Sequence, residues 1–192
     1  QIPWMNYAIW ADDISDARAR MLTARYYGEI SYIDQCLGRI LDAVERRPDA
    51  DDTVIVFFAD HGEHLGDHHA WQKESFFEQA AHVPFLVSWP AALPAGERRD
   101  ELVCLTDLFA IATSAGGETQ ARAGIDVLGV VDGQTAPRPR LIGMYGEPGT
   151  ALFKVMVREA AGDQGHAWKY IFFANGGGEQ LFRISEDPDE QH

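Results

Sequence analysis

The sequence predicts an α/β fold: part of a doubly wound, mostly parallel sheet with flanking helices, followed by a small antiparallel sheet near the C-terminus. A long amphipathic segment, residues 12–47, leads into a continuously apolar strand at residues 53–59. A helix that feeds a strand covered on both faces is typical of a parallel, doubly wound sheet. Strand-like segments without intervening helices follow residue 140, which indicates an antiparallel part. We therefore expect residues 1–139 to be the larger α/β portion and residues 140–192 a small subdomain.

The long helix is predicted from the spacing of its apolar residues. They recur at steps of three and four with charged residues between them, and they are Tyr26, Ile30, Ile33, Leu37, Ile40 and Val44. This spacing places one apolar stripe along one face of a helix. Pro48 and the acidic residues after it end the helix, because proline disfavours helical geometry in the residue before it.

The remaining elements are predicted from composition and from turn residues. We expect short helices at residues 74–81 and 106–115, and an irregular stretch at residues 116–139, which is rich in glycine, proline and small polar residues. Strands are expected at residues 83–89, 140–145, 153–158, 168–174 and 180–184.

Composition excludes several classes of function. The 16 basic and 30 acidic residues give a net charge of −14, which repels nucleic acid. No apolar run approaches the roughly 20 residues of a membrane span, so we expect a soluble chain without a membrane partner, either cytoplasmic or periplasmic and with homo-oligomers still possible. Two cysteines provide no disulfide framework. The first residue is glutamine, which suggests a processed chain or a piece of a longer one.

Asp60 and His61 are the first candidate site residues, because they follow the apolar strand directly. In open α/β sheets, ligands bind outside the carboxyl ends of the strands. A carboxylate oxygen and an imidazole nitrogen there can bind one cation, while Gly62 lets the chain turn away. The competing interpretation, favoured by these three residues alone, is that Asp60 caps a turn and His61 is an ordinary polar residue.

Lys73 is the second candidate, thirteen positions after Asp60. An ammonium on a flexible stem suits the oxyanion of a bound ester. Spacing alone favours a solvated surface lysine. Trp71 either walls a pocket or packs.

The other histidines and the first pair of aspartates are better explained by structural roles than by catalysis or metal binding. His64 and His68 have the spacing of a zinc peptidase helix but lack the glutamate that such a helix uses as its base. We therefore expect His64, His68 and His69 to make loop hydrogen bonds or to form the rim of the pocket. Asp12 and Asp13 suit the N-terminal cap of the long helix better than a cation site.

Taken together, these segments resemble the C-terminal half of type I sulfatases, members of the alkaline phosphatase superfamily. The resemblance is carried by YYGEISYIDQCLGRILDAV at residues 26–44 and by TVIVFFADHGEHLGDHHAWQKESFFEQAAHVPFLVSWP at residues 53–90. LVCLTDLFAIATSAGG at residues 102–117 and the closing WKYIFF and QLFRISEDPDEQH follow in the family's order.

The resemblance implies a divalent cation held by Asp60 and His61 and an ester contacted by Lys73. The cation is expected to be calcium, with manganese or magnesium as alternatives because imidazole is softer than calcium prefers. In such enzymes the cation holds one sulfate oxygen and polarises the sulfur for attack by a formylglycine hydrate. The substrate class implied is a small-molecule sulfate ester.

The sequence departs from the family at the nucleophile. The Cys/Ser-x-Pro/Ala-x-Arg motif is not present, since Cys36 is followed by Leu-Gly-Arg and Cys104 by Leu-Thr-Asp. The aspartate pair that completes the cation site also belongs to the family's N-terminal half. We therefore expect a C-terminal sulfatase fragment that is inactive alone, binds metal weakly and has the missing N-terminal half as its partner. The alternatives are a phosphonate or phosphate monoester hydrolase of the same superfamily and a noncatalytic binding module.

Overall fold

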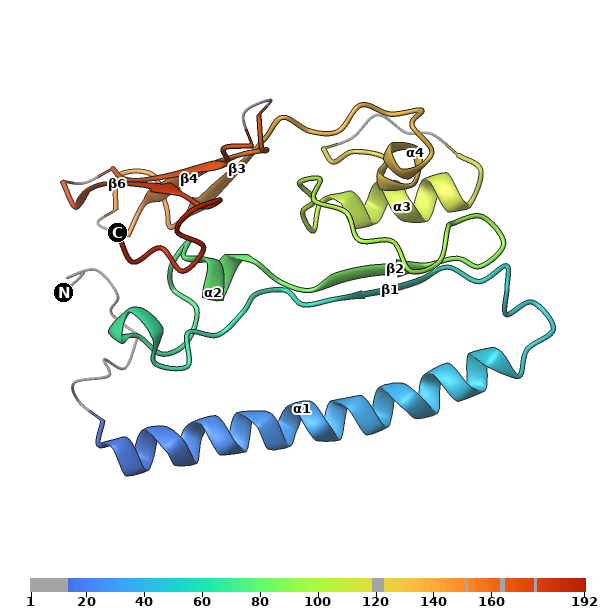
Figure 1. Cartoon of the computed structure of the whole chain (residues 1–192), viewed down its shortest axis with the longest axis horizontal. Helices are drawn as coiled ribbons and strands as arrows, with labels where there is room; N and C mark the ends of the chain where they lie inside the picture. The colour runs from blue at the N-terminus through green and yellow to red at the C-terminus, as the bar shows by residue number, and fades with distance from the viewer. Residues whose placement is uncertain (1–13, 119–122, 151, 163–164, 175) are drawn as a thin grey trace. The chain divides into compact units, whose positions relative to one another are not determined.

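The computed structural model describes residues 14–192 except 119–122, 151, 163–164 and 175 (Figure 1). The Asp12–Asp13 cap predicted for the long helix lies outside these residues. The described residues form two compact units. Residues 14–74 and 79–96 form the helix–hairpin unit, and residues 75–78 and 97–192 form the sheet unit. The predicted boundary between residues 139 and 140 stays a prediction.

The helix–hairpin unit begins with the predicted long helix, α1 (Asp16–Glu45), a single uninterrupted rod in Figure 1. The helix ends before Pro48, where Arg47 pairs with Asp49 at 2.6 Å. None of the helical residues of α1 is buried. Ile33 and Ile40, on the predicted apolar face, are 56% and 60% exposed. The amphipathic pattern therefore predicts the helix correctly, but its apolar face is not covered by the described residues.

The apolar strand predicted after the helix is β1 (Ile55–Phe58), and it pairs with β2 (Phe85–Ser88). The pairing is antiparallel, with Ile55 opposite Ser88 and Phe58 opposite Phe85. The α/β class is confirmed, but this pairing departs from the parallel one that we expected. The physical reason is the connection, because residues 59–84 return as a loop and contain only short helical turns instead of a full crossover helix.

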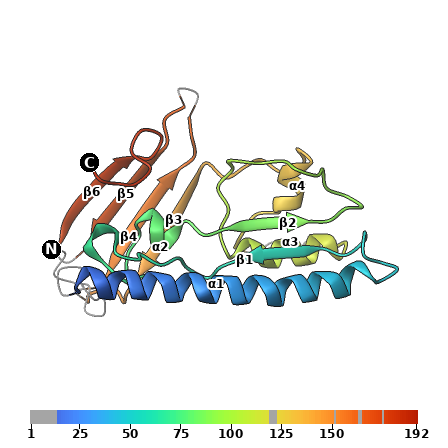
Figure 2. The ribbon, with the colours of Figure 1, turned by 60° about the horizontal axis from the view of Figure 1, so that its bottom comes forward.

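The sheet unit contains the small C-terminal antiparallel sheet, as predicted. Its strands are β3 (Arg140–Tyr145), β4 (Lys154–Glu159), β5 (Trp168–Phe173) and β6 (Gly178–Arg183). Figure 2 shows them side by side in chain order, each antiparallel to the next. Such a meander needs only short turns, which the glycines between these strands supply.

One face of this sheet carries the core of the unit. Met156, Ile171 and Phe182 alternate inward from β4, β5 and β6, and they enclose Phe77. Gly143 on β3 permits close packing, since a Cβ there would lie 2.9 Å from Cε1 of Phe76. The segment at residues 75–78 is therefore held against the sheet by apolar burial.

Two helices complete the sheet unit, α3 (Asp107–Ala115) and α4 (Val127–Val131), which lie next to each other. The helix α4 corrects the prediction of an irregular stretch at residues 116–139. Asp126 explains its start, since the carboxylate accepts a hydrogen bond from the N–H of Gly129 at 3.1 Å. The signal was a single capping residue before a run of only five residues.

A buried ion pair links the start of α3 to a later loop. Arg138 donates to Asp107 at 2.7 and 2.9 Å, and the Asp107 side chain is fully buried. Burial by itself raises the pKa of Asp107, but hydrogen bonds from Arg138 and from two backbone amides outweigh it and hold this pKa below its usual value. Asp107 is therefore an ionised anchor.

Two further facts bear on the expectations from composition. No helix among the described residues combines the length and the apolar character that crossing a bilayer requires. Cys36 and Cys104 are both free thiols.

Candidate functional site

Asp60 and His61 follow the end of β1, and the side chain of Asp60 contacts both the backbone and the ring of His61. The Asp60 side chain is 80% exposed, and its Oδ1 accepts a hydrogen bond from the backbone N–H of His61 at 3.0 Å. Its Oδ2 lies 3.5 Å from Nε2 of His61. This spacing fits two adjacent ligands of one divalent cation, because bonds of about 2.3 Å at roughly a right angle span about 3.3 Å.

The hydrogen bonds of His61 define which of its ring nitrogens is available. Nδ1 lies 2.8 Å from the carbonyl oxygen of Gly62, and a carbonyl only accepts, so Nδ1 carries the proton. Nε2 therefore presents its lone pair on the side of Asp60. A backbone carbonyl that fixes the tautomer in this way is the usual support of a metal-binding histidine.

Lys73 joins the same arrangement from twelve residues further along the chain. Its Nζ lies 2.5 Å from Nε2 of His61, where the ammonium donates to the ring lone pair. The structure thus brings Asp60, His61 and Lys73 together at one exposed place, as the sequence interpretation requires. The site presents a positive group, a carboxylate and an imidazole to a shared region of solvent.

The loop that returns the chain from His61 to Lys73 is closed by its own hydrogen bonds. The N–H of His64 donates to the carbonyl of Gln72 at 2.9 Å, and Oε1 of Glu63 accepts from the N–H of Gln72 at 2.5 Å. These bonds bring residues 63 and 72 side by side. Lys73 consequently reaches back to His61 with little freedom in the backbone between them.

Gly62 is required by the close approach of a neighbouring segment. Its N–H donates to the carbonyl of Ala80 at 2.8 Å, and a Cβ at this position would lie 1.9 Å from the carbonyl oxygen of Gln79. Only glycine fits here. The turn expected of Gly62 is thus accompanied by a steric constraint that links the site to residues 79–80.

The loop between Gly62 and Lys73 is tightly wound and partly strained. Leu65, His68, His69 and Gln72 all have positive φ, between 52° and 72°. Such geometry costs of the order of 1 kcal/mol per non-glycine residue and is concentrated at functional sites. A short 3-10 turn, η2 (Asp67–His69), lies in the middle of the loop.

The additional histidines differ in burial, since His64 is buried, His68 is half-buried and His69 is exposed. His64 is 1% exposed, and its ring meets that of His68 edge to face at a centroid distance of 6.2 Å. Trp71 is also buried, at 6% exposure, so of the two roles considered for it, packing fits this burial. Among the described residues, no cluster of three or more His, Cys, Asp or Glu side chains is arranged to hold a metal. Asp60 and His61 are therefore a pair of candidate donors without a third His, Cys, Asp or Glu beside them among the described residues.

Two sets of charged residues with structural contacts, one in each unit, were missed by the sequence interpretation. Glu63 closes the loop, and the only signal for it was its place two residues after His61. Glu78, Lys169 and Glu190 form a buried ionic cluster, for which no local pattern existed because the residues are 91 and 112 positions apart from Glu78.

The chain matches known proteins over most of its length. The family model named Sulfatase matches residues 6–117. The choline-sulfatase of Rhizobium meliloti (strain 1021) is 31% identical over 184 residues, which cover 93% of this chain and 34% of that protein. Human iduronate 2-sulfatase is 41% identical over 83 residues, which cover 41% of this chain and 15% of that protein.

Solved structures agree on the fold. A phosphonate monoester hydrolase from Silicibacter pomeroyi superposes with a TM-score of 0.74 at 24% identity, and the match covers 91% of this chain and 38% of the other. The chain spans about a third of the length of the choline-sulfatase that it matches. The family model's match at residues 6–117 includes Asp60, His61 and Lys73, and the chain belongs to the sulfatase family of the alkaline phosphatase superfamily.

Proposed function

We propose that this chain supplies half of the active site of a sulfatase that hydrolyses small-molecule sulfate esters. In this proposal Asp60 and His61 are cation ligands and Lys73 contacts the ester. The observation that carries it is the convergence of three side chains, with Nζ of Lys73 2.5 Å and Oδ2 of Asp60 3.5 Å from Nε2 of His61. An anionic ester needs positive charge at this place, and a cation needs the two donors.

The cation proposed for this site is calcium, with manganese and magnesium as alternatives. Asp60 supplies a hard carboxylate oxygen, and His61 supplies a neutral nitrogen whose tautomer is fixed by Gly62. When bound, a divalent cation polarises an ester oxygen and stabilises the charge that develops during hydrolysis. Lys73 would hold the ester by its charge, and it must leave the lone pair of His61 when that nitrogen binds the cation.

The incompleteness of the site supports a second part of the proposal. Two protein ligands are few for calcium, which takes six to eight oxygens, and the nucleophile motif of the family is not in this sequence. We infer that the chain alone is inactive, binds its cation weakly and acts with the N-terminal half of the enzyme.

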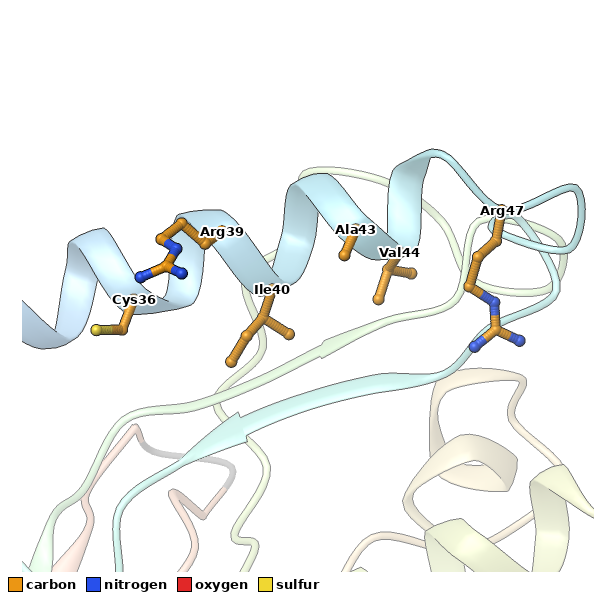
Figure 3. Close-up of a pocket in the computed structure, with 6 residues that line it drawn as sticks. All are labelled: Cys36, Arg39, Ile40, Ala43, Val44 and Arg47. Atoms are coloured by element: carbon orange, nitrogen blue, oxygen red, sulfur yellow. The ribbon is translucent and has the colours of Figure 1, made fainter.

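The apolar face of α1 is the surface proposed for that half. A hollow of about 560 Å³ runs along the helix and is lined by Cys36, Arg39, Ile40, Ala43, Val44 and Arg47. Figure 3 shows Ile40 and Val44 pointing to the same side of α1. Apolar side chains that are more than half exposed, such as Ile33 and Ile40, gain free energy when a partner covers them.

The experiment that tests the function combines metal and ester. The chain is titrated with Ca²⁺ and Mn²⁺, and it is assayed with an aryl sulfate before and after mixing with a separately produced N-terminal half that contains the nucleophile motif. We expect millimolar cation affinity and no turnover alone, and turnover after mixing. Tight binding of a cation by the chain alone, or turnover that survives both Asp60→Ala and Lys73→Ala in the mixture, would contradict the assignment.

A phosphonate or phosphate monoester hydrolase is the second candidate. It is favoured by the likeness to the phosphonate monoester hydrolase structure and by chemistry, since a cation and a lysine serve a phosphoryl oxyanion equally well. Assaying the same mixture with an aryl sulfate and an aryl phosphonate distinguishes the two. A chain that binds neither cation nor ester in any mixture would instead be a noncatalytic binding module.

A further inference from the structure

The four-stranded sheet has a second face, opposite to the face that carries the core, and this second face is apolar and open to solvent. Side chains alternate between the two faces along each strand, so Ile142 and Met144 on β3 and Leu181 on β6 point away from the core. These three residues are 65%, 72% and 60% exposed. We call this surface the outer face, and its apolar side chains are Ile142, Met144, Val155, Val157, Tyr170, Phe172 and Leu181.

The strand register arranges these side chains in two rows that cross the sheet. The first row consists of Ile142, Val157, Tyr170 and Leu181, and the second consists of Met144, Val155 and Phe172, with Glu179 at its end. Residues directly opposite each other on neighbouring strands are in side-chain contact. The outer face is therefore one continuous apolar patch, and patches of this kind mark interaction surfaces more often than single exposed side chains do.

The polar group within the two rows already has a partner on the same sheet. Hydrogen bonding to Glu179 raises the pKa of Tyr170 above its usual value. The outer face thus offers mainly apolar contact, and a segment that covers it must satisfy its own backbone polar groups. An α-helix does so within itself, and its width of about 10–12 Å fits on a sheet of four strands, which is roughly 19 Å wide.

A second copy of this chain is a poor occupant of the outer face. Each strand has six residues, so the face measures roughly 19 Å by 20 Å, or about 400 Å². A stable interface between separate proteins buries about 800 Å² on each partner. The net charge of −14 on each copy also opposes self-association. Area and charge both favour an occupant that is not a second copy.

A segment of the same enzyme needs less area, because a tether supplies a high effective concentration and removes much of the entropy cost of association. The match to the choline-sulfatase covers only 34% of that protein. The enzyme proposed above therefore has a large part outside this chain, and that part can supply the cover.

We propose that an amphipathic helix from a part of the enzyme outside this chain packs its apolar stripe on the outer face of the four-stranded sheet. The inference rests on the proposed function, in which this chain acts together with the rest of a sulfatase. It concerns the sheet unit alone and assigns the outer face as an interface separate from the apolar face of α1.

Oxidation of methionine by hydrogen peroxide tests the cover without any substitution. The peroxide converts an accessible thioether to the sulfoxide and is itself reduced to water, and mass spectrometry of peptides gives the rate at each methionine. We expect Met144 to react about tenfold more slowly in the intact enzyme than in this chain alone. Met156, which is 9% exposed in the core, is the internal control and should react slowly in both. Equal rates at Met144 overturn the proposal.

A variant separates local cover from general loosening of the fold. In the intact enzyme, Ile142→Asp places a charge under the helix and should raise the rate at Met144 about fivefold. Leu86→Asp is the matched control, because Leu86 is 58% exposed on β2 in the other unit, and it should leave this rate unchanged. An equal increase in both variants, or none in Ile142→Asp, contradicts the proposal.

Photochemical cross-linking identifies the occupant. A benzophenone side chain at position 181 of the intact enzyme should attach to residues three and four apart in a segment outside this chain, as the helix requires. Attachment within this chain, or protection of Met144 in the isolated chain that grows with its concentration, overturns the choice of occupant.

Turnover of an aryl sulfate and an aryl phosphonate by the intact enzyme distinguishes this inference from the proposed function. An intact enzyme that hydrolyses neither ester counts against the proposed function, while the rate at Met144 still decides whether the outer face is covered. An active enzyme in which Met144 reacts as fast as in the isolated chain refutes the covering helix alone.

Discussion

Replacing Lys73 with methionine should tighten the binding of a divalent cation, because the ammonium competes for the same lone pair. In the structure Nζ lies 2.5 Å from Nε2 of His61, so the lysine must withdraw before this nitrogen binds a metal. It remains nearby as a like charge. An ammonium and a divalent cation about 4 Å apart in water repel by about 2 kcal/mol, and physiological salt reduces this to roughly 1 kcal/mol. We therefore expect an affinity increase of about fivefold.

The assay is the electron paramagnetic resonance signal of free Mn²⁺ during titration, which measures weak binding directly. Asp60→Asn is the opposite control, since it removes the charged ligand and should weaken binding about tenfold or more. Raising the salt concentration should shrink the effect of Lys73→Met, because both groups are exposed to solvent. Unchanged or weaker binding in Lys73→Met would refute the view that the lysine and the cation share Nε2 of His61.

Two further predictions concern the scaffold. Gly62→Ala places a Cβ 1.9 Å from the carbonyl oxygen of Gln79 and should destabilise the chain by about 2 kcal/mol in urea denaturation. Gly28→Ala is the control, since it lies in open space within α1 and should stabilise the chain by about 0.5 kcal/mol. Equal effects of the two substitutions would refute the steric argument. Asp107→Asn should cost about 3 kcal/mol at pH 7, because it leaves Arg138 unpaired. The folded-state pKa of Asp107 is lowered, so its charged form stabilises the fold above the unfolded pKa of about 4, and this contribution is lost as the pH falls through the folded value. The difference in the free energy of unfolding between Asp107→Asn and the unmodified chain should consequently be smaller at pH 3 than at pH 7. A larger difference at pH 3 would contradict a lowered pKa of Asp107 in the folded state.

Much of the fold was predictable because its determinants are local. The steps of three and four that include Ile33 and Ile40 require α1, and the strand composition after residue 140 predicts the four-stranded antiparallel sheet. The antiparallel pairing of β1 with β2 was not predictable, since the apolar run in β1 indicates burial and says nothing of strand direction. The apolar run predicts a strand that is buried on both faces, but Phe57 and Phe58 are 37% and 42% exposed, because the described residues do not cover them.

In the candidate site, too, contacts between residues near in sequence were predictable, and contacts between distant residues were not. Asp60 and His61 adjoin in the sequence, and Lys73 is returned to them by a loop closed at Glu63 and Gln72. Spacing alone favoured a surface lysine, and it was the resemblance to the sulfatases that predicted the three residues together. No spacing rule could connect Glu78 with Lys169 or Glu190, because a buried ionic cluster has no period and its members meet only after the sheet has formed.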